Sequence, residues 1–565
     1  MKSPRTRKKS SYVIGVDFGT LSARAVLVNV ANGEVCASAV EAYPHGVMED
    51  QLGVDGKALP PQTALQDPSD YLYALKKTIR KVIRQSKVLS NDVVGLGTDF
   101  TCSTVLPTDG AGEPLCTKEE FRREPHAYVK LWKHHASQPE ADAINALAAQ
   151  RKEDFIGAYG GRYSSEWLFA KVLETVRKAP RVHQAAARWI EAGDWIVWQL
   201  TGCENRGVSA SGFKAMRVVD RTGTNHADYP SSEFFAALHP ALADVVESHL
   251  TAPHLAPGKC AGHLTPAFAK CLGLPAGLPV AVGNIDAHAA IPACGVGEPG
   301  RMVMIMGTSS CHLLLAKEGR RIPGVCGVVR EGVMPGLWAY EAGQAGVGDM
   351  LSWFVENSLP AEVFTAARRH TSGVHGVLSD RAAQLKVGQS GLLALDWWNG
   401  NRSVLMDADL SGLLVGLTIQ TKPHEIYRAL VEGMAFGTRK IIEAFTSQKI
   451  AVREVVACGG LASKNPFILQ VYADVIGRPI YLAAATEASA LGAAIFGAVS
   501  AGIYPNFKSA IQTMTQPPIK VFTPDPQRHR QYELLYKEYT RLHDFFGATT
   551  DSTMKRLRAM QRSAI

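Results

Sequence analysis

The chain has 565 residues, of which 46% are hydrophobic and 20% are charged, and its formal net charge is +8. This length exceeds what one hydrophobic core serves, so we expect two domains of roughly 250 residues each. Much of the positive charge lies in the terminal segments 2–9 and 554–562, which lack the aromatic residues of a nucleic-acid-binding motif. We therefore expect no nucleic-acid partner and interpret residues 1–11 as a basic, disordered leader.

The cysteines and the apolar runs indicate the cellular compartment in which we expect this protein. Ten cysteines are scattered singly without a CxxC pair, which argues against a zinc knuckle or a disulfide framework and suits a reducing cytoplasm. The leader is not a signal peptide, because Asp17 interrupts the apolar run that follows it. The apolar segment 490–503 is shorter than the ~20 residues that cross a bilayer, so we expect a cytoplasmic protein with no membrane partner.

The first predicted element is a strand that ends on a carboxylate. Residues 12–17 read YVIGVD, and a short Phe-Gly-Thr turn separates them from a second apolar run. Asn32-Gly33 then marks a turn into a third run, so we predict a meander of three strands. The first turn fits an ordinary hairpin; alternatively, it is a phosphate-binding turn whose Asp17 holds a hydrated metal ion.

A helix and a further strand are predicted next. Residues 67–86 begin with Asp67, an N-cap candidate, and carry apolar residues at helical spacing. The apolar run that follows ends at Asp99, again before small hydroxyl residues. Helical patterns are found around residues 165–178 and 186–200.

The second half of the chain repeats this layout. Residues 300–318 predict a strand, a Gly-Thr-Ser-Ser turn and a strand, while the Gly- and Pro-rich segment 273–300 predicts a crossover between domains. A later strand ends on two glycines, 459–460, before a helix that begins near Asn465. This junction either admits a flat ligand close to the backbone or is a plain loop that needs small residues for packing. After residue 504 we predict helices to the end.

The phosphate-binding signatures of other folds are absent from the sequence. No GxxxxGK[ST], no GxGxxG after a strand, no HExxH and no protein-kinase signature set occurs. If this chain binds phosphates, we expect paired hairpin turns to hold them.

Several motifs resemble a known superfamily. The DxGTxS hairpin, the GTS hairpin and the Gly-Gly junction are similar to those of the actin-like ATPases, and residues 411–432 resemble the second signature of the FGGY carbohydrate kinases, with a departure at Leu430. Motifs from about residue 12 to about residue 560 occur in the order found in the pentulose kinases of that family; they read VKLWKHH, GGRYSSEW, GNIDAHAA, MGTSSCH, YEAGQAGVGD and LLALDWWNGNRS.

The resemblance implies an α/β fold in which two RNase-H-like (actin-like ATPase) domains flank a catalytic cleft. It implies an N-terminal FGGY kinase domain at 12–295 for the sugar and the first phosphate loop, a C-terminal domain at 296–505 for the nucleotide, and a helical extension at 506–565. The implied reaction is phosphorylation of L-ribulose to L-ribulose 5-phosphate in L-arabinose catabolism, with ATP and Mg²⁺ as cofactors. A homodimer is one assembly that the family admits.

The resemblance also implies roles for individual residues. Asp286 is the expected general base and a substrate ligand, and Asp17 is the expected water-mediated anchor for Mg²⁺. The other expected sugar ligands are Cys102, Lys214 and Glu341. The expected nucleotide-binding residues are Thr20, Ser22, Gly307, Thr308, Gly459, Gly460 and Asn465.

Structural and functional alternatives stand beside these roles. Asp286 is alternatively the cap of a helix that starts at Ala287, Lys214 a solvated loop lysine, and Glu341 a cap or a salt-bridge partner. The functional alternatives are a kinase for another pentulose, D-ribulose or xylulose, and a non-catalytic actin-like nucleotide switch.

Overall fold

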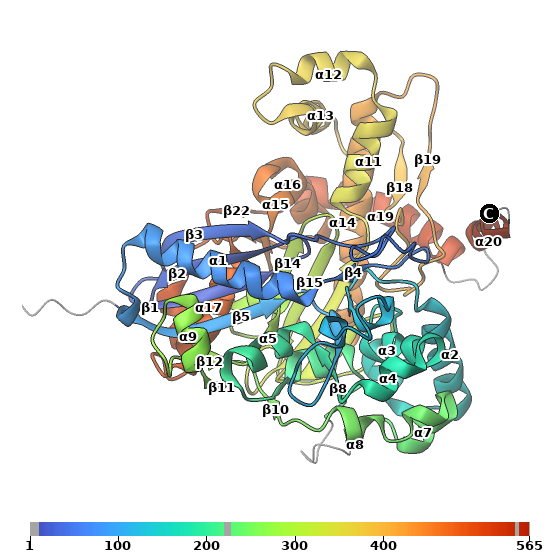
Figure 1. Cartoon of the computed structure of the whole chain (residues 1–565). Helices are drawn as coiled ribbons and strands as arrows, with labels where there is room; N and C mark the ends of the chain where they lie inside the picture. The colour runs from blue at the N-terminus through green and yellow to red at the C-terminus, as the bar shows by residue number, and fades with distance from the viewer. Residues whose placement is uncertain (1–10, 220–227, 548–552, 564–565) are drawn as a thin grey trace, which may run out of the picture. The chain divides into compact units, whose positions relative to one another are not determined.

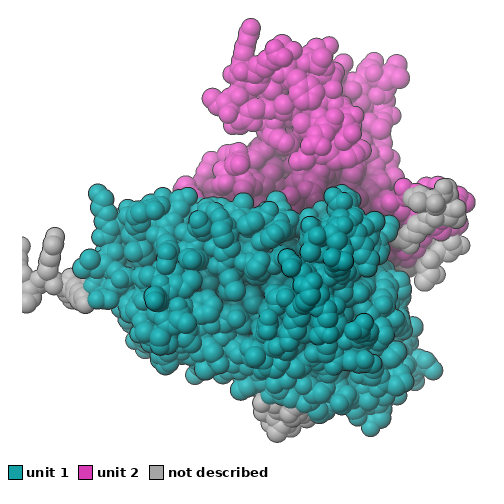
Figure 2. All heavy atoms as spheres, in the orientation of Figure 1, with its two compact units in different colours: residues 1–297, 329–339, 487–516 teal, residues 298–328, 340–486, 517–565 magenta. Residues whose placement is uncertain are grey.

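The computed structural model describes residues 11–219, 228–547 and 553–563. The chain forms two compact units, which are coloured separately in Figure 2. Unit 1 comprises residues 1–297, 329–339 and 487–516, and unit 2 comprises residues 298–328, 340–486 and 517–565. Except for Ser11, the predicted basic leader lies outside the described residues.

Unit 1 is built on a seven-stranded mixed sheet (Figure 1). Its strands are β1 (Tyr12–Phe18), β2 (Ser22–Asn29), β3 (Val35–Ala42), β5 (Val93–Phe100), β11 (Cys260–His263), β12 (Pro279–Ala281) and β13 (Asn284–Ile285). The antiparallel pairing of β1, β2 and β3 confirms the predicted meander. Strand β5 lies parallel to β1 and is the parallel partner of both β12 and β13.

Helices cover both faces of this sheet. The helices that bear on the site are α1 (Pro68–Ser86), α3 (Leu168–Lys178), α5 (Ala192–Thr201), α6 (Val208–Lys214), α10 (Asp286–Ala293) and α17 (Ala488–Ser500). The carboxylate of Asp67 accepts a hydrogen bond from the Ser69 amide at 2.9 Å, which confirms the predicted cap of α1. None of the helices in the described segments has both the length and the apolar character that a membrane crossing requires.

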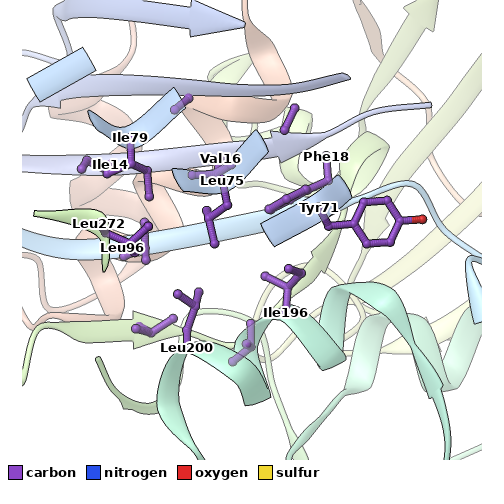
Figure 3. Packing of buried hydrophobic residues seen from close by; sticks show 14 of the residues in the cluster. Ile14, Val16, Phe18, Tyr71, Leu75, Ile79, Leu96, Ile196, Leu200 and Leu272 are labelled. Carbon is purple, nitrogen blue, oxygen red and sulfur yellow. The ribbon is translucent and has the colours of Figure 1, made fainter. Parts of the chain in front are cut away.

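Alternating side chains of β1 enter the core of unit 1. Ile14, Val16 and Phe18 are fully buried, and Figure 3 shows them on the same side as the buried side chains of α1 and α5. Because successive residues of a strand point to opposite faces, Gly15 and Asp17 belong to the other face, where α17 packs. The hydrophobic period of β1 therefore directs Asp17 away from the core.

Two predictions for unit 1 are partly wrong. The segment 186–200, predicted as helix, begins with a strand, β8 (Arg188–Glu191). These residues pair antiparallel with β6 (Val105–Thr108) and so become part of a small sheet. The Gly- and Pro-rich segment 273–300 contains regular structure, namely β12, β13 and α10, in addition to the passage between units at residues 297 and 298.

The sheet of unit 2 repeats the central pattern of the first. Its strands are β14 (Arg301–Met306), β15 (Ser310–Ala316), β16 (Gly327–Arg330), β17 (Trp338–Gln344), β20 (Glu454–Cys458), β21 (Ile480–Leu482) and β22 (Lys520–Phe522). In this sheet β14 lies between an antiparallel hairpin partner, β15, and a parallel partner, β20, just as β1 lies between β2 and β5. The prediction of helices alone after residue 504 is wrong at β22, which pairs with β21.

The helices of unit 2 that bear on the site surround this sheet. They are α11 (Gly348–Ser358), α13 (Gly373–Ala383), α14 (Pro423–Ser447), α15 (Gly460–Lys464), α16 (Pro466–Ile476) and α19 (Pro526–Gly547). Helix α16 begins directly after Asn465, as predicted, but the short helix α15 precedes it at the two glycines.

Candidate active site

Three carboxylates gather where β1, β5 and β13 end in unit 1. Asp17 on β1 and Asp99 on β5 are directly paired in the parallel register, so their side chains project to the same face. Asn284 on β13 pairs with Asp99 from the other side, and Asp286 follows two residues later at the start of α10. This carboxyl end of the parallel strands is where open α/β sheets usually bind ligands.

Burial and mutual repulsion shape the charges of this cluster. Asp99 is fully buried, and burial raises its pKa well above the ordinary value, with the charges of Asp17 and Asp286 acting in the same direction. Burial also raises the pKa of Asp17, against the effect of the guanidinium of Arg24. Arg24 on β2, which is paired with Asp17 on β1, forms an ion pair of 2.5 Å with Glu487.

The first hydroxyl turn is a closed hairpin. The Gly19 amide donates to the carbonyl of Ser22 at 3.0 Å, and Gly19 does not adopt a positive φ. Thr20 is held from two sides, since its carbonyl accepts from Gln66 at 2.7 Å and its hydroxyl accepts from the indole of Trp132 at 3.1 Å. The ordinary-hairpin reading is therefore correct for the backbone, and it is compatible with phosphate binding because the Thr20 O–H remains a donor.

Lys214 is a buried lysine at the end of α6. Only 2% of it is exposed, so the alternative of a solvated loop lysine is wrong. Its ammonium lies 5.5 Å from the ring centre of Trp167 and 5.9 Å from that of Phe213. Such a desolvated cation over aromatic faces is positioned for specific recognition rather than for solubility.

Asp286 is half-buried at the junction of β13 and α10. The amide of Ala287 donates to Oδ1 of Asp286 at 2.7 Å, so one oxygen contacts the first turn of the helix. The helix begins at Asp286, with Ile285 as its N-cap residue, and not at Ala287. Asp286 is thus no conventional cap, although its carboxylate does satisfy a helix amide.

The second hydroxyl turn lies in unit 2, between β14 and β15. Gly307 and Thr308 are exposed, and their carbonyls accept hydrogen bonds from the start of α11, at 3.1 Å from the Gly348 amide and at 2.9 Å from that of Val347. A Cβ on Gly348 would lie 2.5 Å from the Gly307 carbonyl oxygen, so only glycine permits this contact. The close packing fixes the turn and leaves the Thr308 side chain exposed.

The Gly-Gly junction also requires glycine. Gly459 has φ +94°, and a Cβ there would lie 2.5 Å from the Met306 carbonyl oxygen, whereas Gly460 has open space around it. Asn465 is 8% exposed, and its amide donates to Ser379 at 2.8 Å and to Tyr427 at 3.4 Å. The side chain of Asn465 therefore ties α13 and α14 to this loop.

The predicted residues are divided between the units. Unit 1 contains Asp17, Thr20, Ser22, Cys102, Lys214 and Asp286. Unit 2 contains Gly307, Thr308, Glu341, Gly459, Gly460 and Asn465. Glu341 is half-buried on β17, within a strand, so it is not a helix cap.

Sequence reasoning missed two buried charges beside the Cys102 loop. Lys171 on α3 bonds to Ser103, and Glu191 at the end of β8 bonds to Thr104, the two residues that follow Cys102. The only sequence signal for Lys171 was a cation inside an apolar helical run, LFAKVLETV, and Glu191 was hidden in a segment predicted as helix.

Comparison with protein families identifies the class of this chain. The model of the N-terminal domain of the FGGY family of carbohydrate kinases matches residues 12–292, and that of the C-terminal domain matches residues 302–501. The chain belongs to this family. The predicted family and its two-domain α/β fold are therefore confirmed, and the protein is a carbohydrate kinase.

Curated relatives match nearly the whole length of this FGGY kinase. It is 47% identical over 557 residues to a ribulokinase of Geobacillus thermodenitrificans, covering 98% of each chain. It is also 47% identical over 554 residues to a ribulokinase of Mycolicibacterium smegmatis, covering 98% of this chain and 97% of the relative.

Solved structures of sugar kinases share the fold. A xylulose kinase from Rhodospirillum rubrum matches with a TM-score of 0.76 at 23% identity, covering 94% of this chain and 98% of that one. A Plasmodium falciparum glycerol kinase with ADP matches with a TM-score of 0.72 at 16% identity, with the same coverage. At these identities the likeness concerns the fold alone.

Proposed function

We propose that this FGGY kinase transfers the γ-phosphoryl group of ATP to the 5-hydroxyl of L-ribulose, as a step of L-arabinose catabolism. The observation that carries the proposal is the 47% identity with a ribulokinase over 98% of both chains. Coverage of this kind includes both hydroxyl turns, the acidic cluster and the buried Lys214, not only the fold.

Asp286 is proposed as the general base. Phosphoryl transfer needs in-line positioning, charge neutralisation and a group that accepts the hydroxyl proton. Asp286 is a half-buried carboxylate at the carboxyl end of the parallel strands, and one of its oxygens is oriented by the Ala287 amide. A carboxylate held in this way has a fixed direction from which it accepts a proton from a bound hydroxyl.

Lys214, Cys102 and Glu341 are proposed to bind the sugar. The ammonium of Lys214 has three donors for hydroxyl and carbonyl oxygens, and its burial strengthens each such bond. Cys102 lies in the loop that follows β5, directly after Thr101, whose amide donates to the carbonyl of Phe18 at 3.0 Å. Glu341 supplies a carboxylate acceptor, so donors and acceptors are both present for a polyol.

The acidic cluster fits a hydrated Mg²⁺. Mg²⁺ keeps several waters and takes one or two carboxylates together with substrate phosphates. Asp17 offers a half-buried carboxylate, and the fully buried Asp99 lies beside it in the paired register of β1 and β5. We propose that Asp17 holds the ion through water; when bound, the ion neutralises charge on the phosphates.

The hydroxyl turns and the Gly-Gly junction are proposed to bind the nucleotide. The hydroxyls of Thr20 and Ser22 and the exposed Gly307-Thr308 turn supply donors for phosphate oxygens. Gly459, Gly460 and Asn465 are proposed to line the adenosine site, since Gly460 has open space at its Cα. In this scheme residues 12–295 carry the sugar site apart from Glu341, residues 296–505 carry most of the nucleotide site, and residues 506–565 extend the C-terminal end.

The test is a substrate screen of the purified protein. ADP release is measured with MgATP and each of the four 2-ketopentoses, and the phosphorylated product is identified by NMR. We expect the highest kcat/KM with L-ribulose and phosphate at O5. A higher kcat/KM with D-ribulose or a xylulose would identify that sugar as the substrate in place of L-ribulose. ADP release that does not depend on sugar would favour a nucleotide switch.

A further inference from the structure

The loop that carries Cys102 has a backbone conformation that is unusual for its sequence. Ser103 has φ +58°, in the left-handed region that residues other than glycine rarely adopt. It is fully buried, and its hydroxyl has no hydrogen-bond partner. A strained, buried residue of this kind persists only where the surrounding structure holds it.

One of the groups that hold the loop is the ammonium of Lys171. This side chain is fully buried on α3. Its Nζ donates to the carbonyl of Ser103, to that of Leu131 at 2.8 Å and to that of Lys130 at 3.3 Å. All three donors of the ammonium therefore serve backbone carbonyls, and one of these belongs to the strained residue.

Glu191, at the end of β8, holds the next residue of the loop. Its Oε2 accepts from the Thr104 amide at 3.0 Å, and the amide of Ala192 donates to the Thr104 carbonyl at 2.7 Å. Its other oxygen, Oε1, is buried and makes no hydrogen bond. A buried carboxylate with an unsatisfied oxygen is costly, so packing alone does not explain it.

The electrostatics link this pair to the sugar site. Burial raises the pKa of Glu191, and the charges of Lys171 and Lys214 are among the effects that oppose the shift. Burial lowers the pKa of Lys171, against the charge of Glu191. Glu191 thus lies within electrostatic reach of Lys214, a proposed sugar ligand. Its carboxylate also bonds to the loop that carries Cys102, a second proposed sugar ligand.

We propose that Lys171 and Glu191 are positioning residues of the pentulose pocket, which together hold the 101–104 loop in the strained conformation that presents Cys102 to the sugar. This inference rests on the proposed function. Two buried charges reach consecutive residues of one loop from different elements, α3 and β8. Release of either contact lets Ser103 relax to an ordinary φ and moves Cys102 with it.

The same helix offers a matched control. One turn after Lys171, Thr175 accepts a hydrogen bond from the buried ammonium of Lys130 at 2.7 Å, and Lys130 pairs with Glu174 at 2.7 Å. The side chain of Thr175 bonds to no residue of the 101–104 loop. Thr175→Val therefore disturbs buried polar packing in α3 without releasing the loop.

The experiment measures the Kd of L-ribulose and of a non-hydrolysable ATP analogue by calorimetry, with Tm and steady-state kinetics, on the full chain. Glu191→Met and Lys171→Met remove the contacts at similar length, and Glu191→Gln keeps an oxygen for the Thr104 amide. We expect both methionine variants to weaken L-ribulose binding by about tenfold to a hundredfold, with ATP-analogue binding unchanged. Glu191→Gln should restore most of the affinity, and Thr175→Val should lower Tm alone.

Three results overturn the proposal. A folded Glu191→Met variant with wild-type affinity for L-ribulose would remove the positioning role, as would an equal loss of sugar affinity in Thr175→Val. If Lys171→Met does not fold, the comparison of Glu191→Met with Glu191→Gln decides. If the wild-type chain binds none of the four 2-ketopentoses, both the proposed function and this inference are wrong. If the wild type binds L-ribulose and the variants bind it equally well, only this inference is wrong.

Discussion

Gly97 of β5 lies so close to Ala493 of α17 that a Cβ atom on the glycine would be 1.9 Å from the alanine carbonyl oxygen. Gly15 on the neighbouring β1 has the same relationship with Ala490, again at 1.9 Å. Backbone therefore packs on backbone at this face of the unit 1 sheet. Helix α17 lies in the sequence between β21 and β22 of the unit 2 sheet, yet it belongs to unit 1.

We predict that Gly97→Ala lowers the free energy of unfolding by about 1–3 kcal/mol. The added methyl group would meet backbone atoms, which cannot rotate away as a side chain can. Urea unfolding followed by circular dichroism measures the change. Gly110→Ala is the control, since its Cβ would have no atom closer than 3.9 Å and its φ is not positive. Equal stability of the two variants would show that α17 shifts at little cost.

This relationship marks the limit of prediction from the sequence. The hairpins and the α1 cap were predictable because turn residues and an N-cap lie next to the elements that they start or end. The residues 490–503 were excluded as a membrane span, but nothing local says which sheet they cover. Likewise, Glu191 lies on a strand only because β6 pairs with it, and its bond to Thr104 spans 87 positions.

A buried histidine should make unit 2 sensitive to acid. Burial lowers the pKa of His312 on β15 from 6.5 to about 3, and its Nδ1 has no hydrogen-bond partner. Between these values the unfolded chain binds a proton that the folded chain does not, so stability falls as the pH falls below 6.5. At pH 5 the loss is about 2 kcal/mol.

His312→Leu removes this proton linkage. The variant should lose about 2 kcal/mol less stability than the wild type between pH 7 and pH 5. Urea unfolding of both proteins at the two pH values gives the difference directly, and the hydrogen bond to Thr438 at 3.1 Å, which the variant lacks at either pH, cancels from the comparison. Identical pH dependence in the two proteins would mean that His312 is protonated within the fold.

The acidic pair at the strand ends gives a prediction for the metal. Asp17→Asn removes a carboxylate that is proposed to hold Mg²⁺ through water, so the Mg²⁺ concentration for half-maximal activity should rise. Asp99→Asn should change it far less, because Asp99 is fully buried and burial raises its pKa well above the ordinary value, which disfavours the charged form. Activity titrated with Mg²⁺ at saturating sugar separates the two, and an equal shift in both variants would contradict the assignment.

Asp286→Asn keeps the shape of the side chain but accepts no proton. We predict that kcat falls by roughly 10²–10⁴, the usual contribution of a general base, while the Kd of L-ribulose changes little. Single-turnover rates and calorimetry on the same preparation measure both quantities. A kcat close to that of the wild type would remove Asp286 from this role and leave it as a residue that orients α10 through the Ala287 amide.

The last prediction separates the two ligands of the site. Thr308→Val removes an exposed hydroxyl at nearly constant volume, and the turn keeps its bonds from Val347 and Gly348 because those use backbone atoms. We expect kcat/KM for ATP to fall by the equivalent of about 1–3 kcal/mol, the usual loss for a hydrogen bond to a charged group, with sugar affinity unchanged.

Lys214→Met is the reciprocal variant, in which an unbranched apolar chain fills the space beside Trp167 without the ammonium. Here sugar affinity should fall while ATP-analogue affinity holds. Calorimetry of each ligand with each variant gives four measurements. The proposed roles require Thr308→Val to weaken only nucleotide binding and Lys214→Met to weaken only sugar binding. In the proposed arrangement the hydroxyl turn reaches only the phosphates and the buried lysine reaches only the pentulose. If Thr308→Val mainly weakened sugar binding, or Lys214→Met mainly weakened nucleotide binding, these two assignments would be reversed.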